Sequence, residues 1–139
     1  MRALIDTNII LDVCFERTDF QDDAVKLFNL IEEKELIGCI SSTSITDIYY
    51  MAHKQFHNKE QAFWVIERLS QLFKILKADE KSIHHAIKLH WKDFEDSVQY
   101  TIAKRSHIKA IITRNKKDYE ESTIPVYTPK EFLELAGIN

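Results

Sequence analysis

Short apolar runs alternate with longer amphipathic stretches along almost the whole chain, and this alternation restricts the fold more than any other feature. Predicted strands lie at Ala3–Ile5, Leu36–Ile40 and Lys109–Thr113, with apolar residues at helical spacing in the intervals between them. Strands that alternate with helices require crossover connections, which are right-handed and leave the strands parallel. Helices then cover both faces of the sheet. The sequence therefore predicts a three-layer α/β/α sandwich with a central parallel sheet.

The remaining elements follow from capping residues and periodicity. In the helix predicted at about Lys59–Leu72, Phe63, Ile66 and Leu69 are expected to face the core. The other expected elements are a helix with an apolar stripe from Phe20 to Ile31, a helix from Ser41 or Ser42 to about Phe56, a strand at Phe73–Lys77, a helix capped by Asp79 and reaching about Leu89, a helix capped by Asp93 over roughly Phe94–Ser106, an extended segment Pro125–Tyr127, and a last helix from Thr128-Pro129 to near Gly137.

Size and composition indicate an ordinary globular chain. Its 139 residues suit one domain, spanning 1–139, with a core that needs no disulfide. The two cysteines, Cys14 and Cys39, do not form a Cys-x-x-Cys pair, which favours a reducing compartment. No signal peptide and no stretch of 18 uncharged apolar residues is present, so we expect a cytoplasmic protein without a membrane span.

The charges are unevenly distributed. The net charge of −3 is not that of a generic nucleic-acid binder. However, the segment from Lys104 to Lys117 carries basic residues and no acid, whereas acids are dense between Asp19 and Glu35. Such polarity is compatible with phosphate binding on one side, although helices often carry such runs as solvated faces.

Four acidic residues are predicted to meet at one edge of the sheet. Asp6 directly follows the first strand, and Asp47 lies in the expected first turn of the helix that leaves the second. Asp96 opens a helix that must run antiparallel to the Lys109–Thr113 strand, and Asp118 follows that strand. Each acid alone has an ordinary explanation, as a helix cap, a first-turn acid or a turn residue. Their shared placement at the carboxyl ends of parallel strands, where ligands bind in such sheets, predicts a site.

Clustered carboxylates repel one another, and a divalent cation relieves the repulsion. Hard oxygen ligands suit Mg²⁺ or Mn²⁺, and we expect Asp6, Asp47 and Asp96 to hold the ion. Two such ions would brace an in-line phosphoryl displacement, and one would lower the pKa of a bound water. Asp118 is expected to assist catalysis through a water molecule or a second metal ion. The candidate substrate-binding residues are Thr113, Arg114, Asn115 and Lys116.

Other chemistries lack their motifs. His53 and His57 stand four residues apart on a predicted helix, but the intervening residues lack the glutamate of a zinc protease. The sequence contains no glycine-rich phosphate loop and no Gly-x-Ser-x-Gly nucleophile elbow. A phosphatase of the Asp-x-Asp type needs an acid where Asn8 stands. A phospho-acceptor signalling domain needs adjacent acids after the first strand, and these are absent.

Taken together, the motifs resemble those of the PIN domain, a metal-dependent ribonuclease fold, and within it the VapC-like toxins of toxin–antitoxin pairs. The resemblance covers almost the whole chain. Asp47 falls where that family usually has glutamate, and Asn115 occupies a position that is often acidic. The segments that carry the resemblance are Leu4–Asp12, Asp93–Tyr100, Ile111–Tyr119 and Ile124–Leu133.

The resemblance implies Mg²⁺- or Mn²⁺-dependent cleavage of RNA, a homodimer, and inhibition by a cognate antitoxin protein. The matching metal ligands are Asp6 and Asp96, with Asp47 as a shorter carboxylate in the third position. One alternative stays open: a PIN-like module altered at Asp47 and Asn115 that no longer cuts and acts as an RNA- or protein-binding scaffold.

Overall fold

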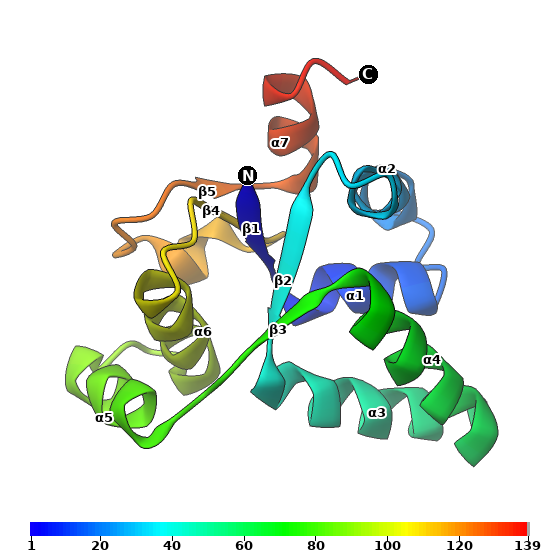
Figure 1. The fold of residues 1–139 in the computed structure, drawn as a ribbon, viewed down its shortest axis with the longest axis horizontal. Coiled ribbons are helices and arrows are strands. Elements are labelled where there is room, and N and C mark those ends of the chain that lie inside the picture. The colour runs from blue at the N-terminus through cyan, green and yellow to red at the C-terminus, as the bar shows by residue number, and fades with distance from the viewer. Residues whose placement is uncertain (139) are drawn as a thin grey trace.

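A computed structural model, which describes residues 1–138, shows a five-stranded parallel sheet in the order β3-β2-β1-β4-β5 (Figure 1). Strands β2 and β3 lie on one side of β1, and β4 and β5 lie on the other, so the strand order reverses between β1 and β4. Asn139, the last residue of the predicted domain, lies outside the described residues. The strands are β1 (Arg2–Ile5), β2 (Ile37–Ser41), β3 (Lys74–Leu76), β4 (Ala110–Ile112) and β5 (Val126–Tyr127).

The helices lie close to where capping residues and periodicity place them. Ser41, Asp79, Asp93 and Thr128 each accept a capping hydrogen bond from the first turn of the helix that follows. The helices are α1 (Thr7–Cys14), α2 (Gln21–Glu32), α3 (Ser42–Phe56), α4 (Lys59–Leu72), α5 (Glu80–Leu89), α6 (Phe94–Arg105) and α7 (Pro129–Leu135), with a single 3₁₀ turn η1 (Lys116–Tyr119). None of them, within residues 1–138, is long and apolar enough to cross a membrane.

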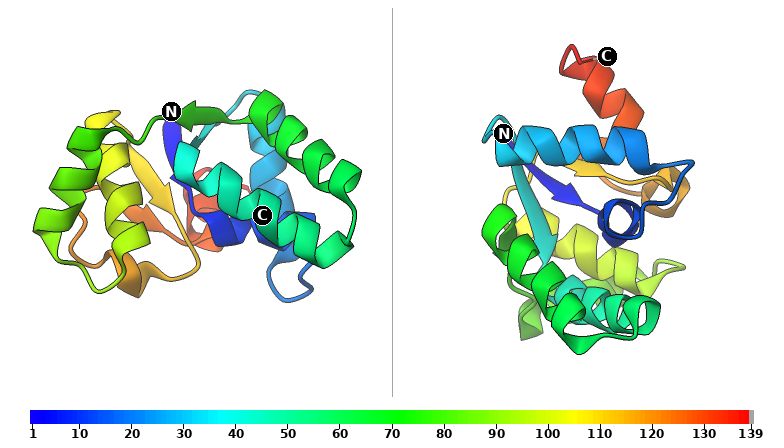
Figure 2. Two further views of the ribbon diagram at one scale, coloured as in Figure 1. Left: turned by 90° about the horizontal axis from the view of Figure 1, so that it is seen from below. Right: turned by 90° about the vertical axis from the view of Figure 1, so that its right-hand side faces the viewer.

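The three predicted layers are confirmed. One hydrophobic cluster packs α1, α2, α3, α4 and α7 against one face of the sheet, through residues such as Ile5 and Ile112. A second cluster packs α5, α6 and η1 against the other face, through Leu4 and Ile111. Successive strand residues thus point to opposite layers. Figure 1 and the left view of Figure 2 show α5 and α6 on one side of the sheet, with α3 and α4 on the other.

Several details differ from the sequence-based expectations. Leu69 is buried and Ile66 is partly buried, as predicted, but Phe63 is 41% exposed because α4 buries Ala62 and Val65 in its place. Phe20 is also exposed and precedes α2. Further differences are that Asp47 lies in the second turn of α3, since Ser41 is its N-cap, that α7 ends at Leu135, and that the turn η1 was not expected.

The reversal of strand order places two chain segments side by side. Ile5 of β1 pairs with Ile112 of β4, so Asp6 and Thr113 leave the sheet at the same level. The Asp6 amide donates to the Ile112 carbonyl at 3.0 Å and extends this pairing by one residue. Ligands of open parallel sheets bind at such a point, outside the carboxyl ends of the strands. The fold therefore locates the candidate site between β1 and β4.

Candidate active site

A polar hollow of about 550 Å³ opens at this point of the sheet. Its acidic lining comes from five parts of the chain that are distant in sequence: the end of β1, α3, the loop before α6, the start of α6 and the segment after β4. The polar residues that line it are Asp6, Thr7, Asn8, Asp47, Asp93, Glu95, Asp96, Asn115 and Asp118. The four predicted acids are thus all present on one surface.

Asp6 is the acid that the structure holds most firmly. It occupies the N-cap position of α1, yet its side chain makes no capping hydrogen bond. Instead, its carboxylate accepts a hydrogen bond of 2.7 Å from the Thr113 hydroxyl and one of 3.2 Å from the Gln99 amide. Burial raises the pKa of Asp6, and these two hydrogen bonds oppose the rise. A plain capping role does not account for this arrangement, because the donors come from α6 and the end of β4.

Asp96 faces Asp6 from the first turn of α6. The α6 cap is Asp93, which accepts the Asp96 amide at 3.1 Å, so the Asp96 side chain is not needed there. Asp96 accepts instead from the Tyr119 hydroxyl at 3.2 Å, and that hydroxyl accepts from the same Gln99 amide. Gln99 and Tyr119 therefore connect the two carboxylates and fix their orientation through buried hydrogen bonds.

The remaining acids are more exposed. Asp47 projects from the second turn of α3, where Tyr50 and Met51 line the same wall of the hollow. Burial raises the pKa of Glu95, and the charges of Asp47, Asp6 and Asp93 add to the rise. Glu95 was not among the predicted site residues, although it lies beside Asp96 in the sequence. It brings a further carboxylate to the hollow.

The segment after β4 contributes Asn115 and Asp118. Asn115 is the N-cap position of η1, and its amide donates to the Thr113 hydroxyl at 3.1 Å. The Asp118 amide donates to the Asn115 carbonyl at 3.0 Å, which closes the turn. Asp118 is near enough to raise the pKa values of Asp6 and Asp96, behind burial as the main cause. Both residues line the hollow together with the predicted metal ligands Asp6, Asp47 and Asp96.

Three predicted substrate-binding residues do not line the hollow. Thr113 is fully buried, with its hydroxyl committed to Asp6. Arg114 turns to the buried Asp12, with Nε 2.8 Å from Oδ2 and Nη2 3.4 Å from Oδ1, and its guanidinium lies 3.9 Å over the Phe20 ring centroid. Lys116 pairs with Glu131 at 3.1 Å. Of the predicted substrate-binding residues, only Asn115 is brought to the hollow.

The acids of the hollow have no basic partner within residues 1–138. The ion pairs that the structure forms there involve Asp12, Asp79, Glu80 and Glu131, none of which lines the hollow. Burial raises the pKa of Asp96 to about 7, and the negative charges of Asp6 and Asp93 contribute. Burial also raises the pKa of Tyr119, so this phenol stays a neutral hydrogen-bond donor. The site is thus an uncompensated negative cluster.

Such a cluster suits a divalent cation by the chemistry of its donors, which are hard carboxylate and amide oxygens. The side-chain positions are less suited as they stand, because no three His, Cys, Asp or Glu residues in the described chain are grouped closely enough to hold an ion. Like charges repel one another, and Asp47 is exposed on α3. The residues therefore fit Mg²⁺ or Mn²⁺ by the chemistry of their donors, but not by the grouping of their side chains in the described chain.

The raised pKa of Asp96 predicts a pH-dependent stability. A carboxyl whose folded-state pKa lies near 7, above the ordinary value of 3.8, stabilises the fold fully at pH values below the ordinary pKa. That contribution is lost as the pH rises through about 7. In chelator, Asp96→Asn should therefore raise the melting temperature relative to the unsubstituted protein, more at pH 8 than at pH 5.

Thermal unfolding of both proteins across this pH range measures the difference. Glu134→Gln, at an exposed acid of α7 outside the hollow, is the matched control and should show no such trend. A difference between Asp96→Asn and the unsubstituted protein that stays constant from pH 5 to pH 8 would contradict the raised pKa. Mn²⁺ should reduce the difference at pH 8, since it neutralises the same charge.

Known proteins share this architecture. A sequence profile of the PIN domain matches residues 2–117. The protein named Ribonuclease VapC1, from Aquifex aeolicus (strain VF5), is 28% identical over 138 residues, which is 96% of this chain and 94% of that protein. The profile match includes Asp6, Asp47 and Asp96 but ends before Asp118.

Solved structures of low sequence identity have the same fold. The DNA-bound VapBC from Salmonella typhimurium superposes with a TM-score of 0.72 at 18% identity, covering 93% of this chain and 98% of that one. A toxin–antitoxin complex from Klebsiella pneumoniae gives 0.66 at 23% identity, with coverage of 91% and 97%. At such identities the likeness extends to the arrangement of strands and helices alone.

Proposed function

The chain belongs to the PIN domain family, and on that premise we propose that it is an endoribonuclease that hydrolyses RNA phosphodiester bonds. The observation that carries the proposal is the hollow at the reversal of strand order, lined by carboxylates from five chain segments that have no basic partner within residues 1–138. A negative cluster of this kind destabilises a protein unless a cation neutralises it. Phosphodiester hydrolysis assisted by divalent cations is a use for such a cluster.

In this proposal Asp6, Asp96 and Asp47 hold Mg²⁺ or Mn²⁺, with Glu95 as a further carboxylate of the same hollow. When bound, the cation neutralises charge on the phosphate and lowers the pKa of water. Gln99 and Thr113 orient Asp6, and Tyr119 orients Asp96. Asn115 and Asp118 position the substrate or a water at the opposite wall, since both line the hollow and neither is ion-paired within residues 1–138.

We further propose that the protein is the toxin of a toxin–antitoxin pair, acting in the cytoplasm as a homodimer restrained by a cognate antitoxin. Support comes from the relative named Ribonuclease VapC1 and from the fold shared with toxin–antitoxin complexes. The competing candidate is a silent module of the same fold that binds RNA or protein. It is favoured by one observation, the absence within residues 1–138 of three grouped metal-binding side chains.

Incubation of the purified protein with a labelled RNA separates the two candidates. We expect discrete fragments with Mn²⁺ or Mg²⁺ and none when a chelator is in excess. Without a cation, the carboxylates would repel the negative charge that develops on the phosphate in the transition state. Calorimetric titration with Mn²⁺ should give binding that Asp6→Asn weakens. RNA that stays intact with either metal, together with no heat of Mn²⁺ binding, would leave only the silent module.

A further inference from the structure

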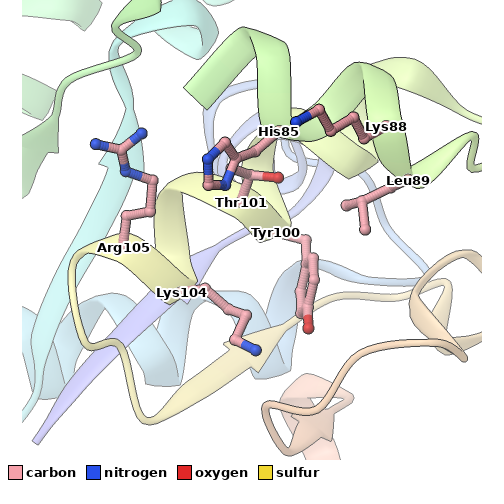
Figure 3. A pocket seen from close by; sticks show the side chains of 7 residues that line it. All are labelled: His85, Lys88, Leu89, Tyr100, Thr101, Lys104 and Arg105. Atoms are coloured by element: carbon pink, nitrogen blue, oxygen red, sulfur yellow. The ribbon is translucent and has the colours of Figure 1, made fainter. Parts of the chain in front are cut away.

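A second cleft, of about 510 Å³, lies between α5 and α6, on the sheet face opposite to α3 and α4. Its polar side chains come from both helices (Figure 3). From α6, Tyr100 and Lys104 extend on the same side, with the Lys104 ammonium 5.9 Å from the Tyr100 ring centroid. The polar residues of the cleft are His85, Lys88, Tyr100, Thr101, Lys104 and Arg105, and no acid lines it.

The cleft concentrates positive charge on a chain whose net charge is −3. Neither residues 81–92, which include most of α5, nor residues 97–117, which include most of α6, contain an aspartate or glutamate. Arg105 is partly neutralised by Asp79 at 3.6 Å. Within residues 1–138, no carboxylate pairs with Lys88 or Lys104, and both side chains are exposed. Two ammonium groups without a carboxylate partner in residues 1–138 thus line the same cleft, and that of Lys104 lies beside the Tyr100 ring.

Aromatic side chains join this cleft to the acidic hollow. Trp91 stacks on Tyr100 with ring centroids 4.7 Å apart, and it meets Tyr119 edge-on at 6.1 Å. Tyr119 in turn donates to Asp96. Next to the acidic hollow, a smaller depression lined by Trp91, Lys92 and Lys117 shares Asp93 and Asp118 with it. Glu120 and Glu121 also line that depression, so the strong positive charge belongs to the α5–α6 cleft.

The spacing of the two sites suits a single strand of nucleic acid. Asp96 and Lys104 are eight residues apart on α6, which is about 12 Å along the helix axis. This corresponds to on the order of three or four stacked nucleotides. Single strands bind to grooves in which basic side chains contact the backbone and aromatic rings can stack with bases. An acidic protein segment would use the lysines equally well but would gain little from the partly exposed Trp91.

We propose that the α5–α6 cleft is a backbone-binding site for the RNA strand that leaves the acidic hollow, with Lys88 and Lys104 each contacting a phosphate. The inference rests on the proposed ribonuclease function and adds the path of the substrate beyond the cleaved bond. Of the basic run of residues 104–117, Lys104 and Arg105 line the cleft, whereas Arg114 and Lys116 are engaged elsewhere.

The test measures binding separately from cleavage. Asp6→Asn protein in excess chelator is titrated with a fluorescently labelled 20-nucleotide single-stranded RNA, at several salt concentrations. Each phosphate contact on a single strand contributes about 0.7 to the slope of log affinity against log salt. The double variant Lys88→Gln, Lys104→Gln should therefore lower the slope by about 1.4. Between 1 M and 0.1 M salt, the affinity of the double variant for RNA should rise about 25-fold less than that of the parent protein.

The matched control replaces two lysines on the other sheet face, Lys26→Gln on α2 with Lys130→Gln on α7, and should leave the slope unchanged. RNA binding that does not distinguish the two double variants would overturn the cleft as a binding site and leave the ribonuclease proposal intact. The same holds if no RNA binds at low salt while metal-dependent cleavage is observed. If cleavage is absent but the lysine-dependent slope is present, the ribonuclease proposal fails and the cleft stands as an RNA site.

Two further measurements complete the test. In the otherwise unsubstituted enzyme, the Lys88→Gln, Lys104→Gln pair should raise KM for a long RNA. It should leave KM for a dinucleotide unchanged, because two nucleotides are too short to span the distance of about 12 Å between Asp96 and Lys104. Poly-glutamate is the competing ligand. Lysine-dependent binding of poly-glutamate, with RNA binding unaffected by the same substitutions, would overturn the proposal in favour of an acidic protein partner.

Discussion

Replacing Asp96 by asparagine is expected to lower the rate of RNA cleavage by about 10³-fold while the protein stays folded. Asparagine has nearly the same shape, and its carbonyl oxygen can still accept the Tyr119 hydroxyl that Asp96 accepts at 3.2 Å. The lost charge removes several kcal/mol of stabilisation that a carboxylate-held cation gives to the transition state, and each ~1.4 kcal/mol is tenfold in rate. Cleavage at saturating Mn²⁺, with circular dichroism as the check on folding, measures the effect.

The same loss is expected for Asp6→Asn, because Asp6 faces the same hollow and is held by Gln99 and Thr113. Glu134→Gln is the control, since it removes one carboxylate from α7, outside the hollow. Activity that survives in both the Asp6 and the Asp96 variants would refute the assignment of the site. A variant that loses activity only because it unfolds would show a lowered melting temperature, which is the opposite of what relief of repulsion predicts.

The backbone arrangement was largely predictable from sequence because its causes are local. Capping residues such as Ser41 and Asp79 begin helices within one turn, and apolar periodicity separates strands from helices over short windows. Alternation of the two, with right-handed crossovers, then fixes parallel strands and three layers. The errors also have local causes. On α4, Leu69 was correctly expected inside, but Phe63 was expected inside in place of Ala62, its neighbour in the sequence.

The site was predictable only in part. The order of elements predicts where the backbone places a residue, but it does not predict which partner the side chain binds. Topology alone brings the carboxyl ends of β1 and β4 together, so the gathering of Asp6, Asp96 and Asp118 at one edge follows from the order of elements. Gln99 is 93 residues from the Asp6 that it binds, and no spacing rule connects them. The available signal was that Gln99 stands between Val98 and Tyr100 in the buried part of α6, where a polar side chain needs a partner.

The basic residues show the same limit more clearly. Arg114 and Lys116 follow β4 next to Asn115, and from sequence all three looked equally placed for a substrate phosphate. In the structure only Asn115 lines the hollow, because Arg114 pairs with Asp12 and Lys116 pairs with Glu131. Asp12 is the decisive neighbour, since a carboxylate only 1% exposed requires a cation.

Arg114→Met is accordingly expected to lower the free energy of unfolding by about 3 kcal/mol. Methionine keeps an unbranched apolar side chain but removes the guanidinium that lies over the Phe20 ring, and it leaves the buried Asp12 with Arg17 alone, at 3.3 Å. Urea denaturation at neutral pH gives the change in unfolding free energy. Adding Asp12→Leu to Arg114→Met should recover much of the loss, because replacing a buried ion pair by apolar residues is often neutral.

The same variant decides between two roles for Arg114. If its guanidinium serves Asp12, Arg114→Met should leave KM for RNA within about twofold, provided that cleavage is measured at a temperature where the variant is fully folded. If it contacts the RNA backbone, as its position beside Asn115 first suggested, binding weakens and the salt slope falls by about 0.7, with little change in stability. We expect the first result because Nε and Nη2 of Arg114 already face the Asp12 carboxylate. A phosphate would have to displace that carboxylate, whose other cationic partner within residues 1–138 is the partly exposed Arg17.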